Sequence, residues 1–216
     1  MSEPLSFIHR FEPGGDANAR PVLLLHGTGG DENDLLPLGR VIAPDAPLLS
    51  PRGKVLENGM TRYFRRVAGG VFDEDDVRRR AIELVDFIAE ARSHYGLSPP
   101  VALGYSNGAN TAAAILLLRP ETLAGAILLR ATLPLQESEP VDLAGKPVFI
   151  ATGGSDPMMS PEGAAKLAAR LQQYGAVVEH RTLPVGHELS QADVSLARQW
   201  LRMGHSGARE ARTRNP

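Results

Sequence analysis

A serine between two glycines lies near the middle of the chain. Residues 104–108 read GYSNG, which has the form Gly-x-Ser-x-Gly. They join an apolar run at 101–105 to an alanine-rich segment at 107–118, so the serine stands where a buried strand should turn into a buried helix. Such a turn strains the backbone and exposes the hydroxyl, as in a nucleophile elbow. The pattern predicts that Ser106 is a catalytic nucleophile; the alternative is a tight turn with an incidental serine.

A serine nucleophile needs a general base, usually a histidine. The histidines after Ser106 are His180, His187 and His205. His180 lies inside an expected strand and His205 in a polar tail, whereas His187 lies in a loop after the last expected strand. Loops at this edge of a parallel sheet commonly carry catalytic groups. We therefore expect His187 to be the base, the alternative being a helix-capping or exposed histidine.

The base needs a carboxylate that orients it. Asp156 follows an expected strand at 147–151 directly, within a glycine-rich turn. Asp142 precedes the same strand, and Asp193 follows the candidate base, which breaks the chain order serine, acid, histidine. We expect Asp156 to be the acid, although an aspartate before a proline is also common in plain turns.

A glycine-rich loop at 26–31 (HGTGGD) follows the first buried strand. Its amides, together with the amide after the nucleophile, suit an oxyanion hole. We expect Asn107 and Thr28 to be the donors, with Gly27 or Gly29 as alternatives to Thr28. The loop lacks the third glycine of a dinucleotide fingerprint and the Gly-Lys-Ser/Thr of a P-loop. The acidic run that follows lacks the spacing of a calcium loop, so it is interpreted as the start of a helix.

Short apolar runs alternate with longer segments of helical period, which is typical of an α/β protein with a mostly parallel sheet. Strands are expected at 5–11, 21–25, 47–50, 101–105, 124–129, 147–151 and 177–183. Helices are expected at 73–95, 107–118, 160–174 and 188–203. Because the carboxyl ends of parallel strands share one edge, the three candidate residues should meet there.

Composition excludes several classes of function. The chain has 216 residues, 43% hydrophobic and 22% charged, with a formal net charge of -2 and no cysteine. One domain at 1–203 is expected, followed by a disordered tail at 204–216. Without cysteine there is no disulfide, thiolate metal site or cysteine nucleophile. We also expect no nucleic-acid partner, no membrane span and, since no targeting segment is apparent, a cytoplasmic location.

Residues 52–71 show no clear period and form the longest expected loop. A loop of this size in a compact domain is usually functional. Arg62, Tyr63 and Phe64 are therefore candidates for the substrate pocket, the alternative being that they only anchor the loop.

In these motifs the chain resembles the phospholipase/carboxylesterase family of α/β hydrolases, which includes acyl-protein thioesterases and bacterial carboxylesterases. The resemblance rests on segments 25–31, 104–110, 153–157 and 186–188. Segments 50–53 and 57–64 are similar to a bacterial branch of hydroquinone-resistance hydrolases. The resemblance implies an α/β-hydrolase fold with helices on both faces of the sheet, a triad of Ser106, Asp156 and His187, no metal or organic cofactor, and a possible homodimer.

The expected activity is hydrolysis of small carboxylic esters. Acyl-protein thioesterases usually carry Gln after the nucleophile, whereas this chain has Asn107, and its 52–71 loop is rich in arginine. Both differences favour a small ester over a long acyl chain. The alternatives are a silent scaffold that binds a small molecule, or a (lyso)phospholipase, thioesterase or amidase with the same triad. The length leaves no room for a separate cap domain, so the site should be open and roofed only by loops.

Overall fold

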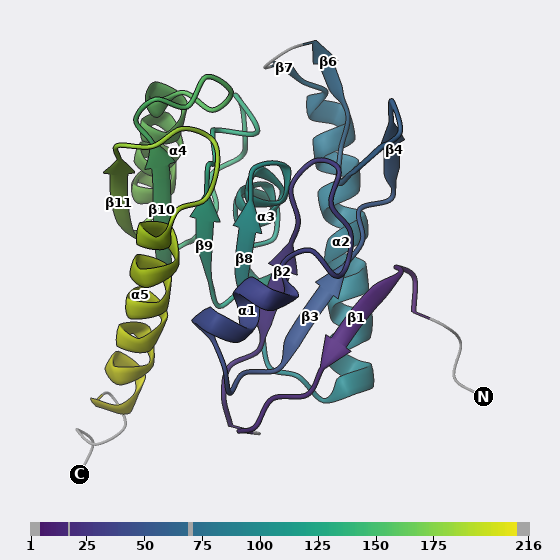
Figure 1. Cartoon of the computed structure of the whole chain (residues 1–216), viewed down its shortest axis with the longest axis vertical. Helices are drawn as coiled ribbons and strands as arrows, with labels where there is room; N and C mark the ends of the chain where they lie inside the picture. Colours follow the sequence, from purple (N-terminus) through teal and green to yellow (C-terminus); the bar gives the residue numbers. More distant parts are fainter. Residues whose placement is uncertain (1–4, 17, 69–70, 211–216) are drawn as a thin grey trace.

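A twisted, mostly parallel sheet forms the centre of the computed structural model, which describes residues 5–16, 18–68 and 71–210 (Figure 1). Among these residues the sheet has seven strands, in spatial order β1 (His9–Glu12), β3 (Leu48–Pro51), β2 (Val22–Leu25), β8 (Val101–Tyr105), β9 (Gly125–Leu129), β10 (Pro147–Gly153) and β11 (Val177–Leu183). Only β1 is antiparallel to its neighbour. The predicted architecture is confirmed.

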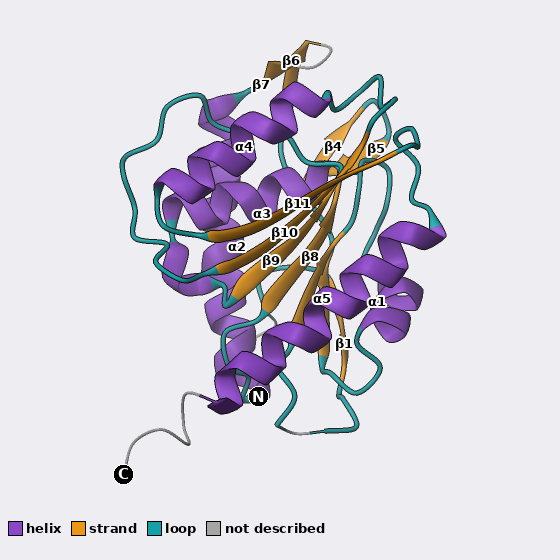
Figure 2. Ribbon diagram, turned by 90° about the vertical axis from the view of Figure 1, so that its left-hand side faces the viewer, coloured by secondary structure: helices purple, strands orange, loops and turns teal. Residues whose placement is uncertain are grey.

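Helices cover both faces of this sheet (Figure 2). They are α1 (Leu36–Ile42), α2 (Glu74–Tyr95), α3 (Asn107–Leu118), α4 (Pro161–Gln173) and α5 (Gln191–Glu210), with a short 3-10 turn, η1 (Pro120–Thr122). Helices α1 and α5 pack on one face, and α2, α3 and α4 on the other. In the part of the chain that the structure describes, no helix combines the length and apolarity that a membrane span requires.

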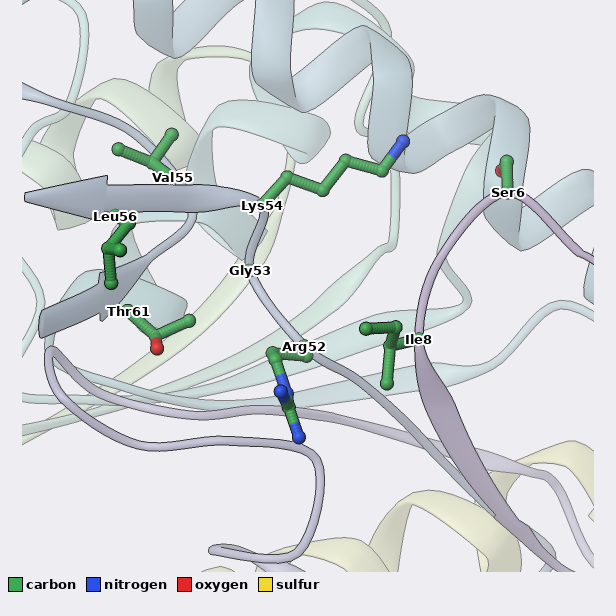
Figure 3. Close-up of a pocket in the computed structure, with 8 residues that line it drawn as sticks. All are labelled: Ser6, Ile8, Arg52, Gly53, Lys54, Val55, Leu56 and Thr61. Atoms are coloured by element: carbon green, nitrogen blue, oxygen red, sulfur yellow. The ribbon is translucent and has the colours of Figure 1, made fainter.

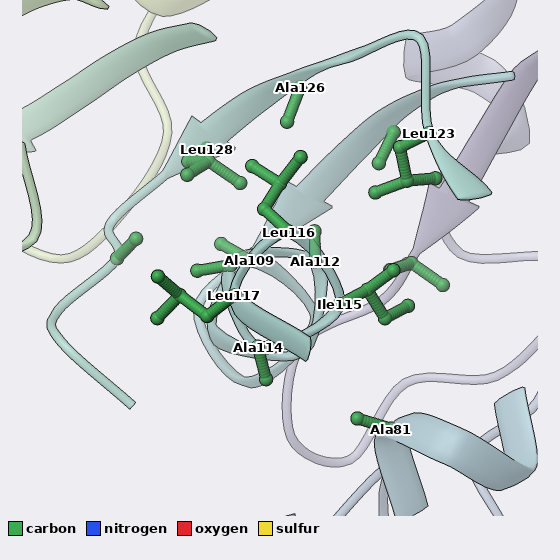
Figure 4. Close-up of a cluster of buried hydrophobic side chains, with 14 of the residues drawn as sticks. Ala81, Ala109, Ala112, Ala114, Ile115, Leu116, Leu117, Leu123, Ala126 and Leu128 are labelled. Carbon is green, nitrogen blue, oxygen red and sulfur yellow. The ribbon is translucent and has the colours of Figure 1, made fainter. Parts of the chain in front are cut away.

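Helix α3 is the most buried of the helices and lies between the sheet and α2 (Figure 4). Leu116 and Ile115 have no exposed surface, and Ala126 of β9 and Ala81 of α2 pack near them. The many alanines of α3 allow the backbones to come close, and a close-packed interior has little tolerance for a lost side chain.

The helix ends carry local signals that the sequence already contains. Asp73 accepts a hydrogen bond from the amide of Asp76 and so caps α2, while Ser160 caps α4 in the same way, by accepting from the amide of Gly163. Helix α5 differs from the expected end at Met203, because it continues to Glu210. The part of the predicted disordered tail up to Glu210 is therefore helical, and residues 211–216 lie outside the described residues.

The segment expected to be one aperiodic loop contains two small hairpins. They are β4 (Val55–Glu57) with β5 (Met60–Arg62), and β6 (Arg66–Ala68) with β7 (Val71–Phe72). Strands this short show no alternation in the sequence, which is why they were not predicted. Both hairpins lie beyond the carboxyl ends of the parallel strands, at the top of Figure 1.

The burial of α3 leads to a first prediction. Leu116→Ala should lower the free energy of unfolding by about 2–5 kcal/mol, because it removes a fully buried side chain and leaves a cavity. Leu56→Ala, at a side chain that is 74% exposed, should change it by about 0.5 kcal/mol or less. Urea unfolding followed by circular dichroism measures both. Equal losses in the two variants would contradict the packing described for α3.

Candidate active site

The turn between β8 and α3 places Ser106 in a strained backbone conformation. Its φ of 52° and ψ of −112° lie outside the regions that side chains normally allow. The flanking glycines explain how the chain turns here. A Cβ at Gly108 would lie 2.0 Å from the carbonyl oxygen of Leu25, and one at Gly104 would lie 2.6 Å from Ala109 Cα. Neither position has room for a side chain, so the sequence Gly-x-Ser-x-Gly follows from the packing of α3 on β2 and β8.

The three predicted catalytic side chains lie together at the carboxyl edge of the sheet. The Ser106 hydroxyl is 3.0 Å from Nε2 of His187, and Nδ1 of the same ring is 2.8 Å from Oδ2 of Asp156. An ionised carboxylate only accepts hydrogen bonds, so Nδ1 must carry the proton and Nε2 must accept from the hydroxyl. This tautomer can take up the hydroxyl proton of Ser106.

The carboxylate of Asp156 has partners on both oxygens. Its Oδ1 accepts from the amides of Met158, at 2.8 Å, and Met159, at 3.0 Å, while Oδ2 faces His187. Its side chain has no exposed surface. These bonds fix the direction of the carboxylate, so it can hold the imidazole ring in a single orientation.

The loops that carry the acid and the base are in close contact. A Cβ at Gly153, the last residue of β10, would lie 2.2 Å from the carbonyl oxygen of Gly186. The amide of Ser155 also donates to the carbonyl of Val185 at 3.1 Å. The close contact at Gly153 therefore brings the two loops within hydrogen-bonding distance of each other.

The two predicted oxyanion donors come from two different segments, the start of α3 and the glycine-rich loop after β2. Asn107 is the first residue of α3, so its amide has no partner within the helix. In the glycine-rich loop, the amide of Gly29 donates to the carbonyl of Thr61 at 2.8 Å. Gly29 is thus engaged elsewhere, which leaves Thr28, or Gly27, as the candidate for the second donor.

His26 ties the glycine-rich loop to the residues after β3. Its Nε2 accepts from the amide of Gly53 at 3.0 Å, and its Nδ1 donates to the carbonyl of Gly27 at 2.6 Å. Burial lowers the pKa of His26, since the charged ring would lose its hydration. The neutral form is the one that these two hydrogen bonds require.

The three residues expected to line a substrate pocket are all buried. Tyr63 and Phe64 are only 3% and 1% exposed, and the Tyr63 hydroxyl donates to the carbonyl of Pro51. Arg62 is also buried and pairs with Glu57 on the facing strand. These side chains hold the hairpin segment against the domain, and a role for them in lining a substrate pocket stays a prediction. The backbone amide of Tyr63 also donates to the side chain of Asn107 at 2.8 Å.

A pocket of about 530 Å³ borders this segment (Figure 3). It is lined by Ser6, Ile8, Arg52, Gly53, Lys54, Val55, Leu56 and Thr61. None of the three predicted catalytic residues lines it. The pocket lies beside the glycine-rich loop, because two residues of its lining, Gly53 and Thr61, form hydrogen bonds with that loop.

Among the described residues, no cluster of three or more His, Asp or Glu side chains is arranged to hold a metal ion.

Sequence reasoning missed two residues that contact the His187 loop. The hydroxyl of Tyr105 donates to the carbonyl of His187 at 3.1 Å. Arg130, the residue after β9, is fully buried and pairs with Asp193, for which the sequence suggests no such role. The sequence gives one indication of the role of Arg130, which is that a charged residue directly follows an apolar strand.

Comparison with known proteins places the chain among hydrolases of the same size. It is 46% identical over 194 residues to the Bacillus subtilis (strain 168) protein named "Putative hydrolase MhqD", covering 89% of this chain and 96% of that protein. A solved Bacillus cereus carboxylesterase is 42% identical with a TM-score of 0.89, covering 92% of this chain and 94% of that one. A Mesorhizobium loti carboxylesterase is 34% identical with a TM-score of 0.87, covering 92% and 95%. No family model matches the chain.

The packing of the elbow can be tested by adding one methyl group. Gly108→Ala should lower the free energy of unfolding by about 1–3 kcal/mol or more, because the added Cβ collides with the backbone of β2. Gly15→Ala is the matched control, since a Cβ there would meet its nearest neighbour at 3.7 Å, an ordinary contact. Thermal melting of both variants gives the comparison. A Gly108→Ala protein as stable as the control would contradict the close approach.

The buried His26 should make stability depend on pH. Its pKa in the folded protein is below the ordinary value of 6.5, so the unfolded chain binds its proton more tightly. Lowering the pH from 7.5 to 5.5 should therefore reduce the free energy of unfolding, by up to about 1.4 kcal/mol for one such group.

The variant His26→Gln isolates this contribution, because glutamine can still accept from Gly53 but does not titrate. Urea unfolding at the two pH values should show a smaller loss in this variant than in the parent protein. The same loss in both proteins would mean that His26 is not held neutral by the fold.

Proposed function

Since the chain belongs to the phospholipase/carboxylesterase family of α/β hydrolases, we propose that it is a serine esterase that cleaves small carboxylic esters through an acyl-enzyme on Ser106. The observation that carries this proposal is the continuous hydrogen-bond relay from Ser106 through His187 to Asp156. A hydroxyl, a neutral imidazole and a buried carboxylate in this order are the parts that activate a serine for attack on a carbonyl carbon.

In the proposed reaction, His187 removes the proton of Ser106 as the serine oxygen attacks the ester carbonyl. The resulting imidazolium is stabilised by Asp156, whose carboxylate is already held by two amides. His187 then gives its proton to the leaving alcohol, and a water molecule repeats the cycle on the acyl-enzyme. No residue outside the triad has to gain or lose a proton.

The negative charge that develops on the carbonyl oxygen needs donors already in place. We assign this role to the amides of Asn107 and Thr28. The amide of Asn107 also lies at the amino end of α3, where the helix dipole favours negative charge. The Asn107 side chain holds the amide of Tyr63, which couples the position of the hairpin segment to the donor.

Small esters are the proposed substrates because of what surrounds the nucleophile. The elbow carries Asn107 where acyl-protein thioesterases usually carry Gln, and the segments over the carboxyl edge are short hairpins. The homodimer and the cytoplasmic location stay predictions from the sequence.

The nucleophile assignment predicts the behaviour of one variant. Ser106→Ala should lower kcat for p-nitrophenyl acetate by at least about a thousandfold, because no attacking oxygen remains. It should also abolish labelling by a fluorophosphonate probe, which reacts only with an activated serine. Ser50→Ala is the control, since Ser50 is as deeply buried but lies in β3. It should keep both turnover and labelling.

Other outcomes would select the alternatives. A parent protein that the probe does not label would overturn the esterase proposal in favour of a silent scaffold. Faster turnover of a lysophospholipid, of a long-chain thioester or of an anilide would instead place the same triad in a (lyso)phospholipase, a thioesterase or an amidase.

A further inference from the structure

A buried ion pair lies directly behind the loop that carries His187. The side chains of Arg130 and Asp193 have no exposed surface and meet end to end, with Nη1 to Oδ1 at 2.7 Å and Nη2 to Oδ2 at 2.9 Å. Buried ion pairs add little to stability compared with well-packed apolar side chains, because both charges lose their hydration. The location of this pair therefore needs another reason.

The remaining donors of Arg130 point at the His187 loop. Its Nε donates to the carbonyl of Gly186 at 3.0 Å, and its Nη2 donates to the carbonyl of Glu188 at 2.8 Å. The carbonyl between them, that of His187, accepts from the hydroxyl of Tyr105. Three successive carbonyls of the loop are thus held by side chains from the ends of β8 and β9.

The backbone of Arg130 also joins the other parts of the site. Its amide donates to Ala151 of β10 at 2.9 Å, and the carbonyl of the preceding residue, Leu129, accepts from the amide of Ser106 at 2.9 Å. Arg130 has a φ of 59°, which is unfavourable for a residue with a side chain and persists only where the surroundings enforce it. The strained residue lies where the nucleophile, the acid strand and the base loop come together.

We propose that Arg130 is a positioning residue that fixes the direction of the His187 ring relative to Ser106. Asp193 holds the guanidinium of Arg130 in place. This inference rests on the proposed function. Only a planar guanidinium can donate to two carbonyls and both oxygens of a carboxylate at once. The remaining proton on Nη1 faces the carbonyl of Ala151 at 3.3 Å, so each N–H of Arg130 has an acceptor.

Asp193 is suited to this supporting role. Burial disfavours its charge, but the hydrogen bonds from Arg130 and Ser190 outweigh that effect and lower its pKa. The amide and hydroxyl of Ser190 both donate to Oδ2. Asp193 therefore anchors the start of α5 to the same guanidinium that holds the loop.

Two variants test the proposal, and neither of them leaves a buried charge without a partner of opposite charge. Arg130→Met combined with Asp193→Leu replaces the pair by apolar side chains of similar size, a change that folded proteins often tolerate. Arg130→Lys keeps a cation beside Asp193 but cannot reach both loop carbonyls. In each, kcat for p-nitrophenyl acetate should fall about 10- to 100-fold with KM within about twofold, because His187 is displaced from the nucleophile. The assays are made well below the melting temperature of each variant.

A second readout separates positioning from plain structural support. The proton on Nδ1 of His187, which faces Asp156, should give a resolved low-field proton resonance in the parent protein. That resonance should broaden or disappear in both variants. Lys146→Met is the matched control, since Lys146 donates to the carbonyl of Leu123 at the amino edge of the sheet, away from the loop. It should leave kcat and the resonance unchanged.

The outcomes are distinct. Unchanged kcat in folded Arg130→Lys, or in the folded double variant, overturns the positioning role. A fall in the melting temperature alone, with the resonance intact, would also overturn it, because that is the signature of a structural residue. Failure of the esterase proposal itself gives a different result, because the parent protein would then neither turn over the ester nor react with the fluorophosphonate probe.

Discussion

The close approach of α3 to β2 is the constraint on which the rest of the site depends. Gly108 faces the carbonyl of Leu25 with no room for a side chain, and Gly104 faces α3 in the same way. The chain between them can join strand and helix only through the strained conformation of Ser106. Because α3 is buried on all sides, this strain of about 1–3 kcal/mol is held by the surrounding packing. The serine hydroxyl is consequently fixed before any substrate arrives.

The base is held in position in a different way. His187 lies in the loop after β11, which is an edge strand that pairs, among the residues that the structure describes, only with β10. A loop at the edge of a sheet has few backbone partners and opens more easily than the centre. The contacts of Gly153, Tyr105 and Arg130 with this loop compensate for its position. The nucleophile is held by packing, whereas the base is held by hydrogen bonds to its backbone.

The sequence is informative where structure follows from neighbouring residues. The elbow glycines, the caps at Asp73 and Ser160, and the strands that run into Ser106 and Asp156 all leave local signals. The hairpins of residues 55–72 leave none, because strands of two or three residues have no period. The burial of Tyr63 and Phe64 was not predictable either, since an aromatic pair in a loop fits a pocket wall as well as a core. The role of Arg130 depends on partners 56–63 residues away along the chain.

A charged pair is suited to the loop for a reason that apolar packing cannot supply. Apolar contacts fix the distance of a segment from its neighbours but have little directional preference. Hydrogen bonds to carbonyl oxygens fix the orientation of the peptide planes, and the peptide planes on either side of His187 set the direction in which its ring points. Proton transfer between Ser106 and His187 requires a correct angle as well as a correct distance. The burial of Arg130 and Asp193 therefore makes physical sense as a device for orientation, whatever its net effect on stability.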